Sequence, residues 1–333
     1  KNEFVVTNIE SKPFKRNPYA PFRTSTMQQD ASRKLGFGAS RTMQIAQRLY
    51  QGIDIDGETT GLITYMRTDG TDISLEAVAD CRKYINEKIG EKYLPKEARN
   101  YSGKKAKNAQ EAHEAVRPTD INRTPESLKS KLDKDQFRLY ELIWNRTVSS
   151  QMESAEFERT AVDLANKDQS IIFRANGSVQ KFDGFLKLYQ DIKDEDDKEK
   201  DENEEDNLLP EVKENEIMPL EKILNEQKFT QPPPRYSEAS LVKKLEELGI
   251  GRPSTYASII SVLSTRNYVE VLNKKFVPTD RGKLITAFLN QLFKQYVDYN
   301  FTAGLEESLD DITAGKIDWI EVLSKFWKEF NQN

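Results

Sequence analysis

The sequence predicts a multidomain α+β protein in which a β-rich segment lies between two mainly helical ones. A chain of 333 residues has room for roughly two or three domains. β-prone runs with turn signals occupy its middle, and helical periodicity occurs on both sides. An acidic tract at 191–206 and three consecutive prolines at 232–234 mark breaks in this pattern.

The first helical segment is predicted from apolar periodicity and capping residues. Ser40 is suited to N-cap a helix that Gly52 can end, and Ser74 can begin a second helix. Between them, residues 61–66 are typical of a short strand that opens into a polar turn at 67–70. Loops at strand ends commonly carry functional side chains.

The middle segment predicts three short strands and a long solvated loop. The strands are expected at 157–164, 170–175 and 182–189, separated by turn signals that include an Asn-Gly pair. The tract at 191–206 holds eleven acids and three lysines without aromatics, so it is expected to be a loop in water.

The C-terminal segment has the pattern of a helix–turn–helix followed by a hairpin. A leucine stripe with helical spacing precedes a turn at 249–253, and Ser254 or Thr255 can cap the next helix. β-prone runs follow at 268–272 and 276–279. This winged-helix pattern often contacts nucleic acid phosphates, but it also occurs in protein–protein modules, and both alternatives stay open.

Composition excludes several classes of protein. No apolar run approaches the roughly 20 residues that cross a bilayer, so a membrane-spanning protein is not expected. One cysteine, Cys81, and one histidine, His113, leave neither a disulfide framework nor a Cys/His zinc site, and an intracellular setting is expected. The start has no Met and no targeting pattern, so the chain is expected to be a piece of a longer protein.

The net charge of −5 is unevenly distributed. The acidic tract carries −8, so the other residues sum to −5 + 8 = +3. The first 150 residues hold 26 Lys and Arg against 20 Asp and Glu. The overall charge therefore does not exclude a polyanionic partner.

Three side chains are candidates for chemistry, because the familiar nucleotide, zinc-protease and serine-hydrolase motifs are absent. Tyr65 can act as a covalent nucleophile, and Arg67 is suited to bind a phosphate and stabilise a phenolate. On composition alone, a packed aromatic is favoured over a nucleophile for Tyr65. His113 lies in a helix-compatible run (109–118) with Arg117 one turn on, and can hold or pass a proton; a capping or surface histidine is its alternative.

Four runs carry the most specific strings of the chain: PFRTSTMQQDASRKLGFGASRTMQIAQRLYQG (21–52), GLITYMRTDGTDIS (61–74), AQEAHEAVRP (109–118) and EASLVKKLEELGIGRPSTYASIISVLSTRNYV (238–269). Together, and in this order, they resemble the core of bacterial type IA DNA topoisomerase I. The resemblance covers nearly the whole chain, and a coincidental match to both GLITYMRTD and GIGRPSTYA is not expected.

The resemblance implies that Tyr65 attacks a phosphodiester of single-stranded DNA and forms a 5′-phosphotyrosyl bond. Another strand then passes through the gap and the break is resealed, which relaxes negative supercoils without ATP. Arg67 matches the family's phosphate-binding arginine, and His113 matches the histidine that supports cleavage. Further DNA contacts are expected from Arg117, from Arg252, Ser254 and Thr255 at a helix start with free N–H groups, and from Arg266.

The resemblance also implies cofactor and partners. Mg²⁺ is expected in the full-length enzyme through an N-terminal Toprim domain that this sequence lacks, so no cofactor or metal is expected on this chain. The expected partner is a single-stranded segment of negatively supercoiled DNA. The protein is expected to be a monomer in the cytoplasm, associated with the nucleoid, without a membrane or small-molecule partner.

The family architecture is a torus, which implies three domains here: a β-rich arch (1–23 and 152–222), a helical domain that carries the tyrosine (24–151), and a winged-helix-like part of the DNA groove (223–333). Without the Toprim acids, the chain alone is expected to be inactive. The alternatives are a non-catalytic single-strand-binding clamp or interaction module, and a relative specialised in decatenation.

Overall fold

The computed structural model describes residues 3–101, 113–190, 208–225, 227 and 229–331. The chain folds into two compact units. The first, here called the sheet unit, comprises residues 1–19, 81–98 and 148–234, and the second, the helical unit, comprises 20–80, 99–147 and 235–333. The division into three domains expected from the family stays a prediction.

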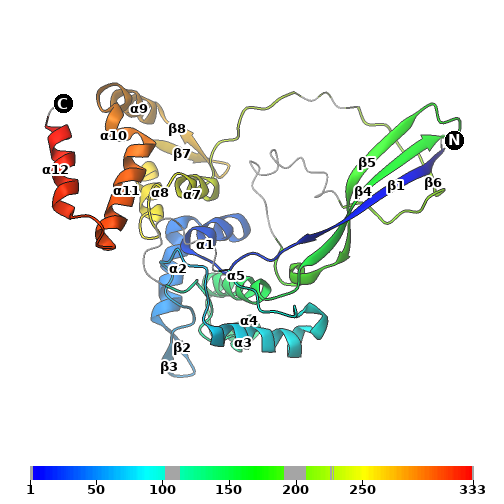
Figure 1. Cartoon of the computed structure of the whole chain (residues 1–333), viewed down its shortest axis with the longest axis horizontal. Helices are drawn as coiled ribbons and strands as arrows, with labels where there is room; N and C mark the ends of the chain where they lie inside the picture. Colours follow the sequence, from blue (N-terminus) through cyan, green and yellow to red (C-terminus); the bar gives the residue numbers. More distant parts are fainter. Residues whose placement is uncertain (1–2, 102–112, 191–207, 226, 228, 332–333) are drawn as a thin grey trace. The chain divides into compact units, whose positions relative to one another are not determined.

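The sheet unit is built on four antiparallel strands in the order β5-β4-β1-β6 (Figure 1). The buried Phe157 on β4 stacks against the half-buried Phe14, which lies opposite it on β1, with ring centroids 5.4 Å apart. The strands are β1 (Glu3–Arg16), β4 (Ala155–Asn166), β5 (Ile172–Phe182) and β6 (Ile217–Pro219).

Two expectations for this unit are wrong. The Asn176-Gly177 pair is not a turn, because both residues pair with β4 inside β5, opposite Ala161 and Thr160. The strand expected at 182–189 is absent: β5 ends at Phe182 and a 3₁₀ turn, η4 (Gly184–Lys187), follows. Gly184 turns the chain with a φ of 51°, where a Cβ would lie 2.5 Å from the Ser154 carbonyl oxygen. The acidic tract lies outside the described residues.

The N-terminal part of the helical unit contains the predicted helices. The second begins at Ser74, whose hydroxyl accepts a hydrogen bond from the Ala77 amide (3.2 Å). The first begins two residues earlier than predicted, because Gly38 and not Ser40 is its N-cap, and it ends at Gly52 with a φ of 119°. The helices and strands of this part are α1 (Thr24–Asp30), the π-helix η1 (Ala31–Leu35), α2 (Ala39–Gln51), β2 (Ile53–Ile55), β3 (Glu58–Thr60), α3 (Leu75–Tyr84), α4 (Pro125–Leu128) and α5 (Lys134–Ser150). By residue number, the last turns of α3 and α5 belong to the sheet unit, as do the π-helix η2 (Ile85–Ile89) and the 3₁₀ turn η3 (Glu91–Tyr93).

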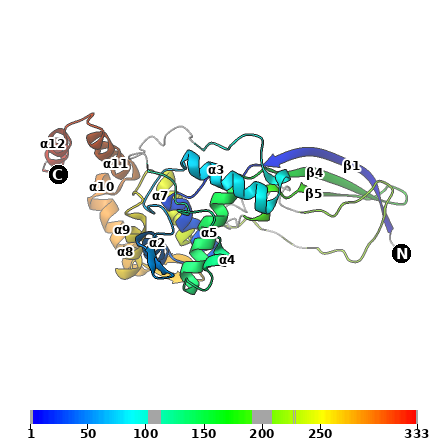
Figure 2. The same ribbon diagram turned by 90° about the horizontal axis from the view of Figure 1, so that it is seen from below.

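The C-terminal part of the helical unit shows the predicted helix–turn–helix and hairpin, namely α7 (Glu238–Glu247), α8 (Tyr256–Thr265), β7 (Val269–Leu272) and β8 (Lys275–Pro278). Val242, Tyr256, Ile260 and Phe276 form its core, and Ala39 of α2 packs into the same cluster. Both views show α2 beside α8 (Figures 1 and 2). Four helices follow: α9 (Asp280–Leu292), α10 (Lys294–Val297), α11 (Tyr299–Thr313) and α12 (Trp319–Phe330). Among the helices described, none has both the length and the apolar character that a bilayer crossing requires.

Candidate functional site

The segment that carries Tyr65 is held by backbone hydrogen bonds on both sides. The Leu62 amide donates to the Leu49 carbonyl at the end of α2 (2.8 Å), and the Thr64 amide donates to the Arg117 carbonyl (2.9 Å). The predicted strand at 61–66 is reduced to an isolated bridge between Ile63 and Pro118. The bridge is held by the Thr64 amide, which donates to Arg117, and by the Thr119 amide, which donates to the Leu62 carbonyl (3.0 Å).

Thr24, at the start of α1, fixes the backbone around Arg67. Its buried hydroxyl donates to the Met66 carbonyl (2.7 Å) and accepts from the Thr68 amide (2.8 Å). Its own amide donates to the Thr68 carbonyl (2.9 Å). Residues of an extended chain alternate in direction. Met66 and Thr68 are buried here, and Tyr65 and Arg67 are therefore exposed.

Tyr65 lies between two other rings. Its ring centroid is 5.4 Å from that of Tyr50, with the rings edge to face, and 5.9 Å from that of His113. The Tyr65 side chain is 38% exposed and its hydroxyl has no hydrogen-bond partner among the described residues. The arrangement differs from the packed core aromatic that composition alone had favoured. The structure thus brings Tyr65 and His113 together.

Arg67 is exposed, and within the described part of the chain its guanidinium makes no ion pair or hydrogen bond. A cation on a well-anchored backbone without an internal acid can accept an external anion without first breaking a salt bridge. Arg117 differs, because its Nε donates to Glu114 (2.6 Å), its Nη1 donates to the Pro118 carbonyl, and its side chain is only 14% exposed.

His113 is positioned by an extended segment and not by a helix. Val116 and Pro118 form isolated bridges with Phe22 and Ile63, and the Val116 amide donates to the Phe22 carbonyl (2.7 Å). Residues 113–118 are therefore not helical, and the helix expected over this run is wrong for them. Residues 109–112 lie outside the described part. Gly70 runs so close to this segment that a Cβ there would lie 2.1 Å from the His113 carbonyl oxygen. Only glycine permits this approach.

The residues expected to bind DNA near α8 are in three different situations. Arg252 is 14% exposed and its guanidinium contacts Asp310 (2.5 Å) and Glu306 (3.8 Å). The expected free N–H groups are not all free, because the Thr255 and Tyr256 amides both donate to the Arg252 carbonyl.

Thr255 is the N-cap of α8, but its hydroxyl binds the Arg252 backbone and does not cap the helix. Ser254 is exposed. Arg266 follows α8, is exposed, and has no ion-pair partner among the described residues.

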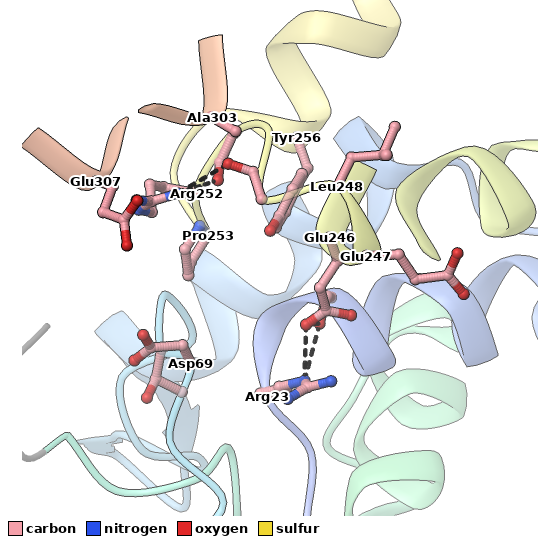
Figure 3. A pocket seen from close by; sticks show the side chains of 14 residues that line it. Arg23, Asp69, Glu246, Glu247, Leu248, Arg252, Pro253, Tyr256, Ala303 and Glu307 are labelled. Carbon is pink, nitrogen blue, oxygen red and sulfur yellow. Dashed lines mark hydrogen bonds and ion pairs between the residues drawn. The ribbon is translucent and has the colours of Figure 1, made fainter. Parts of the chain in front are cut away.

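A pocket of about 420 Å³ lies between the loop after Arg67 and the C-terminal part of the helical unit (Figure 3). Thr68 and Asp69 line one side, and Arg252 lies on the other. Glu246 accepts from Arg23 (2.9 Å) and from the Ser25 hydroxyl (2.7 Å). Burial, with a further contribution from Glu246, raises the pKa of Tyr256, another lining residue, to about 12.

Sequence reasoning missed Tyr50, Thr24, Arg23 and Glu246. Glu246 is more than 200 positions from Ser25, and no local pattern shows that the two residues meet. Thr24 and Tyr50 lie within a quoted motif run, but nothing in their spacing indicates a contact with Tyr65 or its neighbours. Among the described residues, no group of three or more His, Cys, Asp or Glu side chains could hold a metal ion. The described residues therefore do not fit a Mg²⁺ site.

Known DNA topoisomerases match this chain over almost its full length. Residues 1–324 match the family model described as DNA topoisomerase. The chain is 55% identical to DNA topoisomerase 1 of Rickettsia prowazekii over 99% of its own length and 42% of that protein. It is 50% identical to the Zymomonas mobilis enzyme of the same name, of which it covers 26%.

A solved structure shows the same fold. Full-length topoisomerase I from Thermotoga maritima matches all of this chain with a TM-score of 0.83 at 37% identity, and the match covers 52% of that structure. The chain thus spans about two fifths of the length of its Rickettsia relatives. The family model, the relatives and the solved structure agree with the motif around Tyr65, and the chain belongs to the bacterial type IA DNA topoisomerase family.

Proposed function

We propose that this chain is the tyrosine-bearing part of an enzyme that cuts one DNA strand, passes another through the gap and rejoins the first. The observation that carries the proposal is the partly exposed Tyr65 side chain on an anchored loop, with His113 against its ring. Arg67, two residues on, has no ion-pair or hydrogen-bond partner among the described residues. Membership in the topoisomerase family supports it.

In the proposed reaction the Tyr65 oxygen attacks the phosphorus of a phosphodiester in single-stranded DNA. The P–O3′ bond breaks as the O–P bond to tyrosine forms, and the proton lost by the phenol ends on the departing 3′ oxygen. The 5′ end stays attached to Tyr65. Because one phosphoester replaces another, the 3′ hydroxyl can reverse the step and no ATP is needed. Relaxation of negative supercoils follows from strand passage between the two steps.

Arg67 and His113 have distinct proposed roles. Arg67 binds the attacked phosphate and stabilises the negative charge that builds up on it and on the phenolic oxygen. His113, whose ring lies 5.9 Å from that of Tyr65, orients the reacting groups through hydrogen bonds. Mg²⁺, if the full-length enzyme uses it, is bound by residues outside those described, and no step above passes through it.

The DNA partner is proposed to be a single-stranded segment. Arg266 and Ser254, both exposed, are the simplest contacts for its phosphates. Arg117, Arg252 and Thr255 contribute only where their internal partners are exchanged for DNA. The arch, tyrosine and winged-helix-like domains, the monomeric state and a cytoplasmic location remain part of this proposal.

The proposal is tested in a full-length topoisomerase that carries this chain. Tyr65→Phe should abolish cleavage and leave single-strand binding nearly intact, because the phenolic oxygen forms the bond whereas binding rests on many contacts. Arg67→Ala should lower the cleavage rate by roughly 10² to 10³, the scale for removing one donor to a developing oxyanion. His113→Ala should have a milder effect than Tyr65→Phe.

The measurement is denaturing-gel detection of a covalent adduct between protein and an oligonucleotide labelled on either side of the break. Anisotropy with the same oligonucleotide checks that binding is retained. An adduct that persists in Tyr65→Phe, or that carries the 3′ side of the break, contradicts the assignment.

A further inference from the structure

We propose that Tyr50 is a positioning residue that holds the Tyr65 ring ready for attack. The inference rests on the proposed function of Tyr65 and adds a residue that neither the motif nor the family match assigns. Its basis is the edge-to-face contact between the two rings, whose centroids are 5.4 Å apart at an interplanar angle of 67°. Tyr65 is thereby enclosed between Tyr50 and His113.

The backbone fixes Tyr50 relative to Tyr65. Tyr50 lies in the last turn of α2, and Gly61 passes so close that a Cβ there would lie 2.8 Å from the Tyr50 carbonyl oxygen. The Leu62 amide donates to the Leu49 carbonyl one residue earlier. The end of the helix and the start of the Tyr65 segment are therefore held in direct contact.

The contact with Tyr50 matters because Tyr65 is partly exposed and its other ring contact among the described residues, with His113, is longer at 5.9 Å. Its side chain is 38% exposed and its hydroxyl has no hydrogen-bond partner among the described residues. An exposed aromatic side chain changes rotamer on a picosecond to nanosecond scale. One edge-to-face contact shifts such an equilibrium by about threefold to tenfold, so Tyr50 raises the share of time in which the hydroxyl points in one direction.

The ring of Tyr50 acts in this role and its hydroxyl does not. That hydroxyl has no hydrogen-bond partner in the described part of the chain. Tyr50→Phe keeps the ring and is therefore the conservative variant that should rescue function. Tyr50→Leu removes the ring. Because Tyr50 is 40% exposed, its loss should change folding stability little.

The catalytic test measures single-turnover adduct formation in the full-length enzyme. Tyr50→Leu should slow cleavage by about threefold to tenfold with single-strand affinity unchanged within about twofold, and Tyr50→Phe should cleave at the original rate. Tyr19→Leu is the matched control, because Tyr19 is also 38% exposed and packs edge-on against Phe185 in the sheet unit. An unchanged rate in Tyr50→Leu, or an equal loss in Tyr50→Phe or in Tyr19→Leu, overturns the role.

A second measurement does not depend on catalysis. In the 333-residue chain labelled with 3-fluorotyrosine, the ¹⁹F signal of Tyr65, assigned with Tyr65→Phe, should shift toward the value of an unfolded peptide in Tyr50→Leu and stay in place in Tyr50→Phe. If the original full-length enzyme forms the adduct but the Tyr65 signal does not move in Tyr50→Leu, the positioning role of Tyr50 is contradicted and the proposed function of Tyr65 is not. An original enzyme that forms no adduct contradicts the proposed function, and this role with it.

Discussion

Thr24 ties the loop of Tyr65 and Arg67 to α1 through its buried hydroxyl as well as through its backbone amide. Thr24→Val keeps the shape of the side chain but leaves the Met66 carbonyl and the Thr68 amide each without one partner. We expect the free energy of unfolding to fall by about 1 to 3 kcal/mol, the cost of unsatisfied buried polar groups. Urea denaturation followed by circular dichroism measures this change.

The position of Arg67 gives Thr24→Val a second effect. If the Thr24 hydroxyl also places the Arg67 guanidinium, Thr24→Val should slow adduct formation in the full-length enzyme. Tyr65→Phe, in contrast, should leave the free energy of unfolding unchanged. Thr26→Val is a suitable control, because within the described part of the chain the Thr26 hydroxyl bonds to the Arg23 backbone alone. A Thr24→Val protein as stable as the original would show that the loop does not depend on this hydroxyl.

Tyr256 makes stability sensitive to alkaline pH. Burial raises its pKa from 10.0 to about 12, so the folded state disfavours the phenolate. A raised pKa means that the stabilisation is complete below the unfolded pKa near 10 and is lost as pH rises toward 12. Between pH 9 and 12, the original chain should lose about 2 kcal/mol more than Tyr256→Phe. Denaturation curves of both proteins at stepped pH measure the difference, and parallel losses would contradict it.

At the residue scale, the sequence identified side chains through motifs and missed those that meet through folding. Tyr65, Arg67 and His113 were candidates because of their types and their strings, and Tyr65 and His113 do lie together. Tyr50 and Thr24 have unremarkable types and spacings. Their relevance comes from where α1 and α2 place them, which depends on tertiary packing.

At the scale of elements, α8 and the following hairpin offer a matched pair of arginines. Arg266 is exposed without an internal acid among the described residues, whereas Arg252 is held by Asp310 and Glu306. Arg266→Ala should weaken single-strand binding to a similar degree for all sequences and lower the salt slope by about one ion. Fluorescence anisotropy across a series of salt concentrations measures both.

Arg252→Ala should act on stability as well. Its removal leaves the Asp310 carboxylate, 12% exposed, without this guanidinium, so the free energy of unfolding should fall. If Arg252 also exchanges its acids for DNA, the salt slope should fall as it does in Arg266→Ala. An unchanged slope in both variants counts against DNA contacts at this end of the helix.

Periodic elements were predictable, and local turn signals were less reliable. The repeating apolar faces of α2, α7 and α8 identified helices within a few residues of their bounds. The Asn176-Gly177 signal failed because β4 pairs with the chain on both sides of it. Residues 113–118 suit a helix by composition, but their amides find partners at Phe22 and Asp72 instead. Tertiary hydrogen bonds override local propensity in both cases.

At the scale of the whole chain, the described residues supply some of the groups that the proposed DNA cleavage needs, but not a metal site. The candidate nucleophile, its arginine and its histidine are present, whereas the described residues contain no cluster of acids for a metal ion. The chain also covers only about two fifths of the length of its Rickettsia relatives. Catalysis by the isolated chain can therefore be tested separately from DNA binding.

We expect the purified 333-residue chain to leave negatively supercoiled plasmid unrelaxed in Mg²⁺. The described residues offer no cluster of acids that could hold a metal ion at the attacked phosphate, and one arginine offsets only part of the charge that develops there. Agarose gels of plasmid incubated with the chain measure relaxation, and the Tyr65→Phe chain purified in parallel reveals any contaminating enzyme. Adding the remaining segments of a relative in trans should restore activity if they supply the missing groups. Relaxation by the chain alone that disappears in Tyr65→Phe would show instead that the described residues suffice for catalysis.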